Sequence, residues 1–129
     1  MNAPQWLGAE GEKIAARHLA AKGYRIVARN YRFHRNEIDI IAFDGEVLCF
    51  VEVKTRATLG KGHPAESVTT GKQKEIARAA AGYLASLDNP WITCRFDVIA
   101  VLALSIDERS IRKYEIEHIK AAFMIGDKG

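Results

Sequence analysis

Hydrophobic and polar residues follow one another along the chain in patterns that predict both helices and strands. Apolar residues recur at helical spacing in residues 4–21 and about 70–87, and a short last helix is predicted for residues 119–124. Apolar runs of strand length cover residues 24–33, 37–43, 47–54, 95–104 and 111–117. The predicted order is α-β-β-β-α-β-β, and its strand–helix–strand unit predicts a right-handed parallel crossover. We therefore expect an α/β fold with a mixed central β-sheet flanked by helices.

The second and third predicted strands contain charged residues that a buried hairpin would not need. Residues 36–56 read NEIDIIAFDGEVLCFVEVKTR, and the Asp-Gly pair at residues 44–45 is a strong two-residue hairpin signal. Closing the hairpin there places Glu37 opposite Glu52 and makes Asp39 the diagonal neighbour of Glu52. Because successive side chains in a strand alternate between faces, these carboxylates are predicted to share one face.

Carboxylates that converge at the margin of an apolar sheet repel one another, and burial disfavours their ionised form. Either one of them takes up a proton, or a cation lies between them. Mg²⁺ and similar hard cations prefer oxygen ligands and keep several waters, which two or three carboxylates would suit. Lys54 lies on the same face, where its ammonium could hold an attacking water. The alternative is a plain salt bridge of Lys54 with Glu37 or Glu52.

The spacing of Asp39 and the later Glu52-Val53-Lys54 resembles the D…ExK core of the restriction-endonuclease-like nucleases. More specifically, the sequence is similar to the YraN family of uncharacterised bacterial proteins, which are themselves similar to archaeal Holliday junction resolvases. The matching segments lie in order along nearly the whole chain: GEKIAARHLAAKGYRIVARNYR, EIDIIAFDGEVLCFVEVKTR, PAESVTTGKQ, RFDVIAV and IEHIKAAF.

This resemblance implies one nuclease-like domain over residues 1–129 with a restriction-endonuclease-like fold. It implies that Asp39 and Glu52 are the ligands of Mg²⁺ or Mn²⁺ and that Lys54 is the catalytic lysine. Glu12 would match a further acidic residue of the resolvase-like group, and Gln73 a glutamine at the start of the following helix. From the residues alone, Glu12 also fits a solvated helix face, and Gln73 fits a helix cap.

Two further positions, Glu37 and Asn36, lie at the start of the second predicted strand, beside the acidic centre. Glu37, like Glu12, is a candidate metal ligand acting through water. Asn36 stands where the family usually has Gly, and Asn is the residue that best replaces Gly at positive φ.

Asp97 is predicted to be structural and paired with Arg95, because the parallel register is expected to leave it ~15 Å from the charged end of the third strand.

Basic residues surround the acidic segment, with aromatic residues among them. We expect four of them to contact nucleic-acid phosphates: Arg32, Arg35, Arg56 and Lys72. An ordinary solvated face is the alternative. Residues 57–69, which include Lys61 and His63, are predicted to form a mobile flap beside the site.

The composition permits these predictions without demonstrating them. The formal charge of +3 and pI near 9.0 allow an anionic partner. No apolar run approaches the ~18 residues of a membrane span, so we expect no membrane association. Cys49 and Cys94 lie in apolar runs, which predicts free thiols and a cytoplasmic protein.

We therefore expect a metal-dependent nuclease acting on DNA, with branched or otherwise structured DNA as the candidate substrate. A non-catalytic nucleic-acid-binding module with the same fold is the alternative. Since resolvase-like proteins work as dimers, the resemblance also suggests a homodimer.

Overall fold

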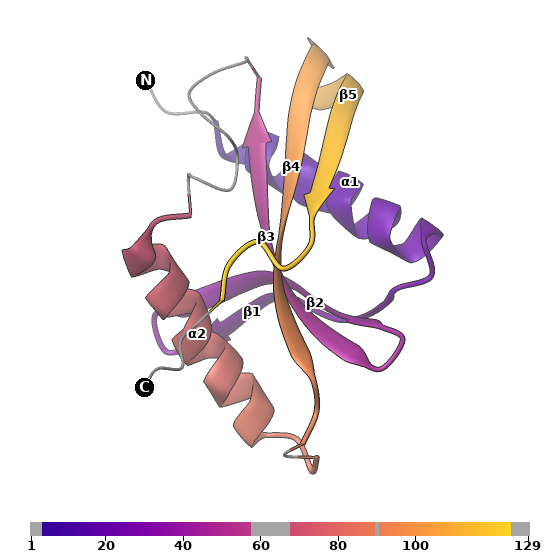
Figure 1. The fold of residues 1–129 in the computed structure, drawn as a ribbon. Coiled ribbons are helices and arrows are strands. Elements are labelled where there is room, and N and C mark those ends of the chain that lie inside the picture. The colour runs from indigo at the N-terminus through magenta and orange to yellow at the C-terminus, as the bar shows by residue number, and fades with distance from the viewer. Residues whose placement is uncertain (1–3, 58–67, 90, 125–129) are drawn as a thin grey trace.

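The computed structural model describes residues 4–57, 68–89 and 91–124. In this part of the chain five strands form one sheet, in the order β1-β2-β3-β4-β5, with a helix on each face (Figure 1). The elements are α1 (Gln5–Ala21), β1 (Arg25–Phe33), β2 (Asn36–Asp44), β3 (Val47–Arg56), α2 (Thr70–Ala85), β4 (Cys94–Asp107) and β5 (Ser110–Ile119). Strands β3 and β4 are parallel and the other neighbours antiparallel, so the predicted mixed sheet and order of elements are confirmed.

Helix α1 packs on one face of the sheet through a stripe that includes Leu7, Ile14 and Leu19. On that face it meets Ile40 of β2 and Val51 of β3, among other apolar side chains. The absence of a side chain at Gly11 brings the helix close to β3, because a Cβ atom there would overlap the side chain of Thr55. Close packing by glycine therefore fixes the height of the first half of α1 above β3.

Helix α2 packs on the opposite face, chiefly over β1 and β2. Ile76 and Ala80 of the helix contact a cluster that contains Ile41 of β2 and Phe50 of β3. The helix begins at Thr70, where the side chain of the preceding Thr accepts a hydrogen bond from the backbone of the first turn. Neither helix of the described part is long and apolar enough to cross a membrane.

The hairpin register differs by two residues from the predicted one. Asp44 pairs with Val47, so the turn consists of Gly45 and Glu46 instead of the Asp-Gly pair. Gly45 has φ of 61° and supplies the positive φ that the first position of such a turn requires. A shift of two residues keeps every side chain on its predicted face but changes which side chains are level with each other.

The predicted last helix at residues 119–124 is wrong. Strand β5 continues to Ile119, and the chain then crosses toward α2 without forming a helix, as Figure 1 shows. Ala121 has φ of 51°, which interrupts any right-handed helix, and the backbone N–H of Ala122 donates to the carbonyl of Phe96. The ring of Phe123 stacks on that of Phe96, so packing against β4 overrides the local helical pattern.

Candidate active site

Asp39 and Glu52 come together where β2 separates from β3. The described pairing of these strands ends with Ile40 opposite Val51, one residue before each carboxylate. Beyond that point the Asp39 side chain replaces the lost backbone partner, because its Oδ2 accepts a hydrogen bond of 2.8 Å from the N–H of Val53. Continuing the observed register places Asp39 level with Glu52, not diagonal to it as predicted.

The surroundings of Asp39, including Glu52, strongly perturb the pKa of Asp39. Burial raises the pKa of Asp39, and the negative charge of Glu52 raises it further. The Val53 N–H opposes this, while the charge of Glu12 and a hydrogen bond with the Glu52 side chain add to it, so the pKa of Asp39 reaches about 8. The raised pKa therefore favours the protonated form of Asp39 at neutral pH.

Glu52 is buried, with 6% of its surface exposed, and two lysines balance its charge. Lys54 Nζ lies 3.6 Å from Glu52 Oε2, and Lys72 Nζ lies 4.0 Å from the same oxygen. Both distances exceed the ~2.8 Å of a charge-assisted hydrogen bond, so the lysines neutralise the carboxylate without a direct hydrogen bond. The salt bridge considered for Lys54 is thus formed with Glu52 on its own strand.

Lys72 reaches Glu52 from the first turn of α2, which makes it part of this centre. From the sequence it was predicted only as a phosphate contact. The signal that could have revealed its position is its place three residues after the N-cap Thr69, at the end of α2 that the crossover from β3 brings near the carboxyl end of that strand.

Glu12 lies near the carboxylates but is held by another partner. Its Oε1 accepts a hydrogen bond of 2.8 Å from Asn30 Nδ2, and its charge contributes to the raised pKa of Asp39. The close approach of α1 at Gly11 places Glu12 at this height above the sheet. Glu12 can therefore act on the centre through its charge.

Glu37 and Gln73 are directed to other partners. Glu37 pairs with Arg32 of β1 at 3.4 Å, and the predicted position of Glu37 opposite Glu52 is wrong because of the two-residue shift in register. Gln73 Nε2 donates to the carbonyl of Val68 at 3.0 Å, which ties the start of α2 to the residue that precedes its cap. This contact does not cap a free N–H of the helix, a role that Thr69 fills.

The predicted phosphate contacts divide between two places. Arg32 and Arg35 are exposed at the end of β1 and in the turn that follows it. Arg56 is half-buried at the end of β3, two residues beyond Lys54. Most of the predicted flap, with Lys61 and His63, lies outside the described residues.

The donor set fits a hard divalent cation. Among residues 4–57, 68–89 and 91–124, no group of three or more His, Cys, Asp or Glu side chains is arranged to hold a metal ion. Two carboxylates with water and substrate oxygens are nevertheless a common Mg²⁺ environment. The negative charge of Glu52, which raises the pKa of Asp39, would also stabilise a cation beside the two carboxyl groups.

A second buried acid, Asp97, lies on the other face of the sheet. It is fully buried and pairs in register with Val51, next to Glu52, so the predicted separation along the strand is wrong. Asp97 shares the face of Val51, toward α1, whereas Glu52 is on the α2 face. The prediction that Asp97 pairs with Arg95 is confirmed, since Arg95 Nε donates to it at 2.9 Å.

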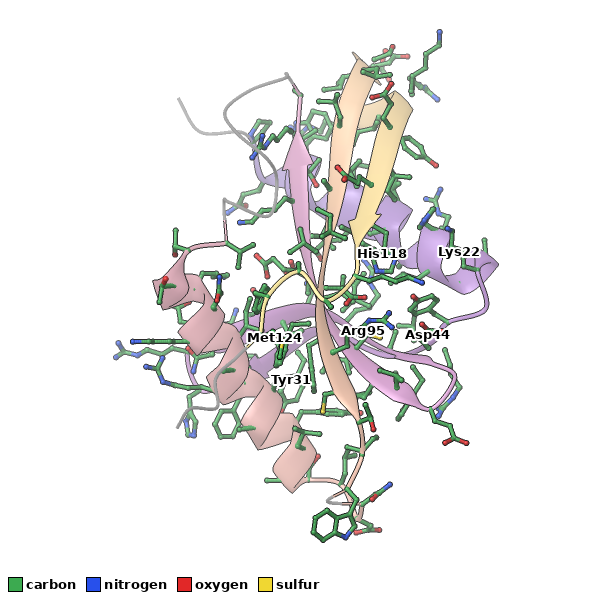
Figure 2. The ribbon with its side chains drawn as sticks, viewed as in Figure 1. Lys22, Tyr31, Asp44, Arg95, His118 and Met124 are labelled. Atoms are coloured by element: carbon green, nitrogen blue, oxygen red, sulfur yellow. The ribbon has the colours of Figure 1, made fainter. Side chains whose placement is uncertain are left out.

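Further donors complete the surroundings of Asp97. Arg95 Nη2 donates to Oδ2 at 3.0 Å, His118 Nε2 to the same oxygen at 2.8 Å, and the N–H of Ala121 to Oδ1 at 3.0 Å. Burial raises the pKa of Asp97, but these hydrogen bonds outweigh it, so its pKa lies below the usual value. Arg95 also donates to Asp44 at 3.1 Å, and Figure 2 shows Arg95, Asp44 and His118 gathered beside β4 on the side of α1.

The fold and the centre together define an α/β protein with a buried Asp–Glu pair and two lysines at the end of a parallel strand. The family model "Uncharacterised protein family UPF0102" matches residues 11–101, so the chain belongs to this family, and the resemblance to the YraN family is confirmed. The chain is 95% identical to UPF0102 protein CT2262 of Chlorobaculum tepidum over the full length of both. It is 78% identical over the full length to a UPF0102 protein of Chlorobaculum parvum. A UPF0102 protein of Nocardia farcinica is 49% identical over 92% of this chain and 90% of that protein.

Proposed function

We propose that the chain is a metal-dependent nuclease that hydrolyses phosphodiester bonds in DNA, on a restriction-endonuclease-like fold formed by one domain. The observation that supports this proposal is the placement of Asp39 beside the buried Glu52 and Lys54, where burial and the charge of Glu52 raise the pKa of Asp39. A carboxyl group whose pKa is raised by burial and by a neighbouring carboxylate is typical of sites that exchange a proton for a metal ion or use it in catalysis. A purely structural acid in this sheet, Asp97, has instead a full set of hydrogen-bond donors and a lowered pKa.

Each residue of the centre has a distinct role in the proposed reaction. Asp39 and Glu52 would hold Mg²⁺ or Mn²⁺, and binding would displace the proton of Asp39. When bound, the ion would polarise the scissile phosphate and acidify a water molecule. Lys54 would orient the attacking water and stabilise the charge that develops on the phosphate oxygens. Lys72, within reach of the same Glu52 oxygen, would balance charge from the side of α2.

The exposed basic residues support a polyanionic substrate. Arg32 and Arg35 extend the positive charge beyond the end of β1, and Arg56 extends it along β3 past Lys54. Glu12 and Glu37 would act through water or through charge alone, and Gln73 would hold the start of α2 in place. We propose branched or otherwise structured DNA in the cytoplasm as the substrate, on the strength of the resemblance to junction resolvases.

Metal titration and cleavage assays test the proposal together. Calorimetric titration should show Mn²⁺ binding that Asp39→Ala abolishes, and the same variant should lose cleavage while its DNA affinity changes little. Asp107→Ala is the matched control, because Asp107 is exposed and pairs with Arg112 far along β4. Linear, nicked, flapped and four-way DNA are the substrates. A purified chain that cleaves none of them with Mg²⁺ or Mn²⁺ contradicts the nuclease proposal.

A non-catalytic nucleic-acid-binding module is the second candidate. The observation that favours it is that Lys54 and Lys72 both balance the charge of Glu52. A chain that binds DNA with unchanged affinity in the presence of a chelator, and that gives no heat with Mn²⁺, would establish this second candidate instead.

A further inference from the structure

A pocket lies beside the start of β3, where the β2–β3 turn faces the connection between α2 and β4. Its volume is about 670 Å³, within the range of ~300–1,000 Å³ that is typical of ligand pockets. The apolar side chains that line it are Phe43, Val47, Leu87, Trp91 and Ile92. The charged side chains that line it are Arg25, Glu46 and Asp88. The pocket therefore offers apolar surface together with charges of both signs, and the acidic centre uses none of these residues.

Trp91 is exposed to an extent that the fold does not require. Its exposed fraction is 88%, although tryptophan is usually largely buried because its ring is a large apolar surface. The backbone N–H of Trp91 donates to Asn89 Oδ1 at 3.0 Å, which holds the turn but does not involve the ring. The ring itself stacks on no other aromatic ring of the described residues. Both faces of the indole are therefore open to a flat ligand.

Arg25 brings an oriented cation to the same pocket. Its guanidinium carbon lies 4.7 Å from the centroid of the Phe43 ring, and the two residues are directly opposite each other on β1 and β2. Stacking on an aromatic face holds the flat guanidinium while its N–H donors stay available. Within the part of the chain that the structure describes, no carboxylate pairs with Arg25. Such a guanidinium is suited to bind a phosphate oxygen.

Glu46 and Asp88 restrict the ligand further. Both are exposed, and neither forms an ion pair with another residue of 4–57, 68–89 or 91–124. An acidic peptide would be repelled by these two carboxylates, and a basic peptide by Arg25. A nucleotide meets neither objection, because its charge lies on the phosphate and its base is neutral. The base also carries amino groups, as in cytosine, that donate to carboxylates.

We propose that this pocket binds an unpaired nucleotide of single-stranded DNA, with the base stacked on Trp91 and the phosphate bound by Arg25. Aromatic rings combined with basic side chains are the usual means of holding single strands. A base within a duplex would not fit, because its neighbours in the stack cover both of its faces. The proposal rests on the proposed function for its ligand, DNA, but it requires no cleavage.

The position of the pocket relative to the acidic centre sets the length of the strand. Phe43 and Asp39 lie on the same face of β2 and are four residues apart, which corresponds to ~13 Å. Ile41, between them, is buried beneath α2, so the strand must pass around the helix. At ~3.4 Å per nucleotide, at least about four nucleotides are needed to reach from one place to the other. The pocket would thus hold the single-stranded arm of a branched substrate.

Tryptophan fluorescence tests the pocket without metal or cleavage. The chain has two tryptophans, and Trp6 packs against the core cluster beneath α1, so Trp6→Phe leaves Trp91 as the reporter. In the presence of a chelator, a short single-stranded oligonucleotide should quench this signal saturably. The same sequence as a blunt duplex should quench it far less. Quenching that is absent at every accessible concentration, or equal for both forms, overturns the proposal.

Substitution of the aromatic ring tests the stacking. Trp91→Ala should weaken single-strand binding at least about fivefold, the effect of losing one stack between a base and an aromatic ring, and should leave duplex binding unchanged. Trp91→Phe should keep most of the affinity. Tyr114→Ala, at another exposed aromatic residue, is the matched control and should bind as the wild type does. Equal losses of single-strand and duplex binding in Trp91→Ala overturn the proposal.

The phosphate contact has its own signature in the dependence of binding on salt. Arg25→Ala should reduce the slope of log affinity against log salt by about 0.7, the value for one phosphate on a single strand. Arg109→Ala, at an exposed arginine in the β4–β5 turn, is the matched control and should leave the slope unchanged. An unchanged slope in Arg25→Ala overturns this contact.

Competition identifies the source of the ligand. An oligonucleotide that binds no more tightly than cytidine monophosphate would identify a free nucleotide and overturn the single-strand proposal, as would quenching by oligolysine alone. The outcome is separable from that of the proposed function. A chain that cleaves no DNA but shows quenching that depends on Trp91 keeps the pocket. A chain that cleaves DNA but binds single strands equally well after Trp91→Ala loses the pocket alone.

Discussion

Two buried carboxylate centres lie back to back on neighbouring strands of this sheet, and they differ in how their charge is satisfied. Asp97, on the α1 face, accepts hydrogen bonds from Arg95, His118 and the backbone of Ala121, and its pKa is lowered. Asp39, on β2, accepts one backbone hydrogen bond and lies beside Glu52, so its pKa is raised. A buried carboxylate that accepts several hydrogen bonds, as Asp97 does, stabilises the fold. Two adjacent carboxyl groups with fewer donors, as at Asp39 and Glu52, still attract a positive charge.

The largest expected effect is on the Asp97 centre. Asp97→Ala removes the acceptor of several buried donors and leaves the Arg95 guanidinium without its main partner. We expect a loss of about 3–5 kcal/mol in the free energy of unfolding, as for other buried ion pairs that lose one member. Urea denaturation measures it, and Asp107→Ala, at an exposed ion pair, should change stability by less than about 0.5 kcal/mol. A loss of that small size for Asp97→Ala would show that the network is not structural.

The two centres should also respond to pH in opposite directions. The folded pKa of Asp97 is lowered, so its contribution to stability is present above the ordinary carboxyl pKa and is lost as the pH falls. The folded pKa of Asp39 is raised from 3.8 to about 8, so the folded chain binds an extra proton between these values. That contribution is complete at low pH and is lost as the pH rises toward 8, by up to about 1.4 kcal/mol per pH unit.

Asp39→Asn isolates the pH dependence of stability that Asp39 causes, because asparagine keeps the shape of the side chain and has no proton to lose. We expect the variant to match the wild type near pH 4 and to be more stable by about 1–3 kcal/mol near pH 6. Thermal unfolding at a series of pH values measures the difference. Asp107→Asn is the control and should follow the wild-type curve. A constant difference between Asp39→Asn and wild type at all pH values would contradict the raised pKa.

Metal binding sharpens the same comparison through the affinity for the ion. If a divalent ion displaces the proton of Asp39, Mn²⁺ affinity should rise about tenfold per pH unit below pH 8 and level off above it. Calorimetry in buffers of different ionisation enthalpy counts the proton released. An affinity that does not depend on pH in this range would place the ion elsewhere.

The smallest effect is expected from Glu12, whose charge is a minor cause of the raised pKa of Asp39. Glu12→Gln should keep the contact with Asn30 and lower the pKa of Asp39 slightly. Glu52→Gln removes a larger cause and should lower it more. Carbon-detected NMR titration of the Asp39 carboxyl measures both. An equal or larger effect of Glu12→Gln would mean that Glu12 lies closer to the pair than the structure places it.

The sequence predicted the features that depend on local hydrophobic pattern and on the alternation of side chains between the two faces of a strand. Alternation identified the charged face of β3, and the spacing of the helix between β3 and β4 predicted the parallel crossover. The hairpin register was wrong by two residues, because both the Asp-Gly and the Gly-Glu pair can close the turn and the choice depends on tertiary contacts. One of these is the hydrogen bond from Arg95 to Asp44, which lies 51 positions earlier in the chain.

The partners of each carboxylate could not be predicted, for the same physical reason. Lys72 meets Glu52 only after the crossover helix has docked, and His118 meets Asp97 only after the last strand has paired with β4. Such contacts join residues far apart in the chain, and no local periodicity encodes them. Gly11 was the best local indication of a contact between distant elements, here α1 and β3, since a glycine inside an apolar helix often marks a close approach to another element.

The hydrogen bond from Val53 to Asp39 links the assembly of the centre to the folding of the sheet. A strand that parts from its neighbour would leave this amide without an acceptor, and the aspartate side chain fills that role. Completion of the central hairpin and placement of the carboxylate are therefore a single event. A chain that has reached its native strand pairing already holds Asp39 beside Glu52, before any ligand binds.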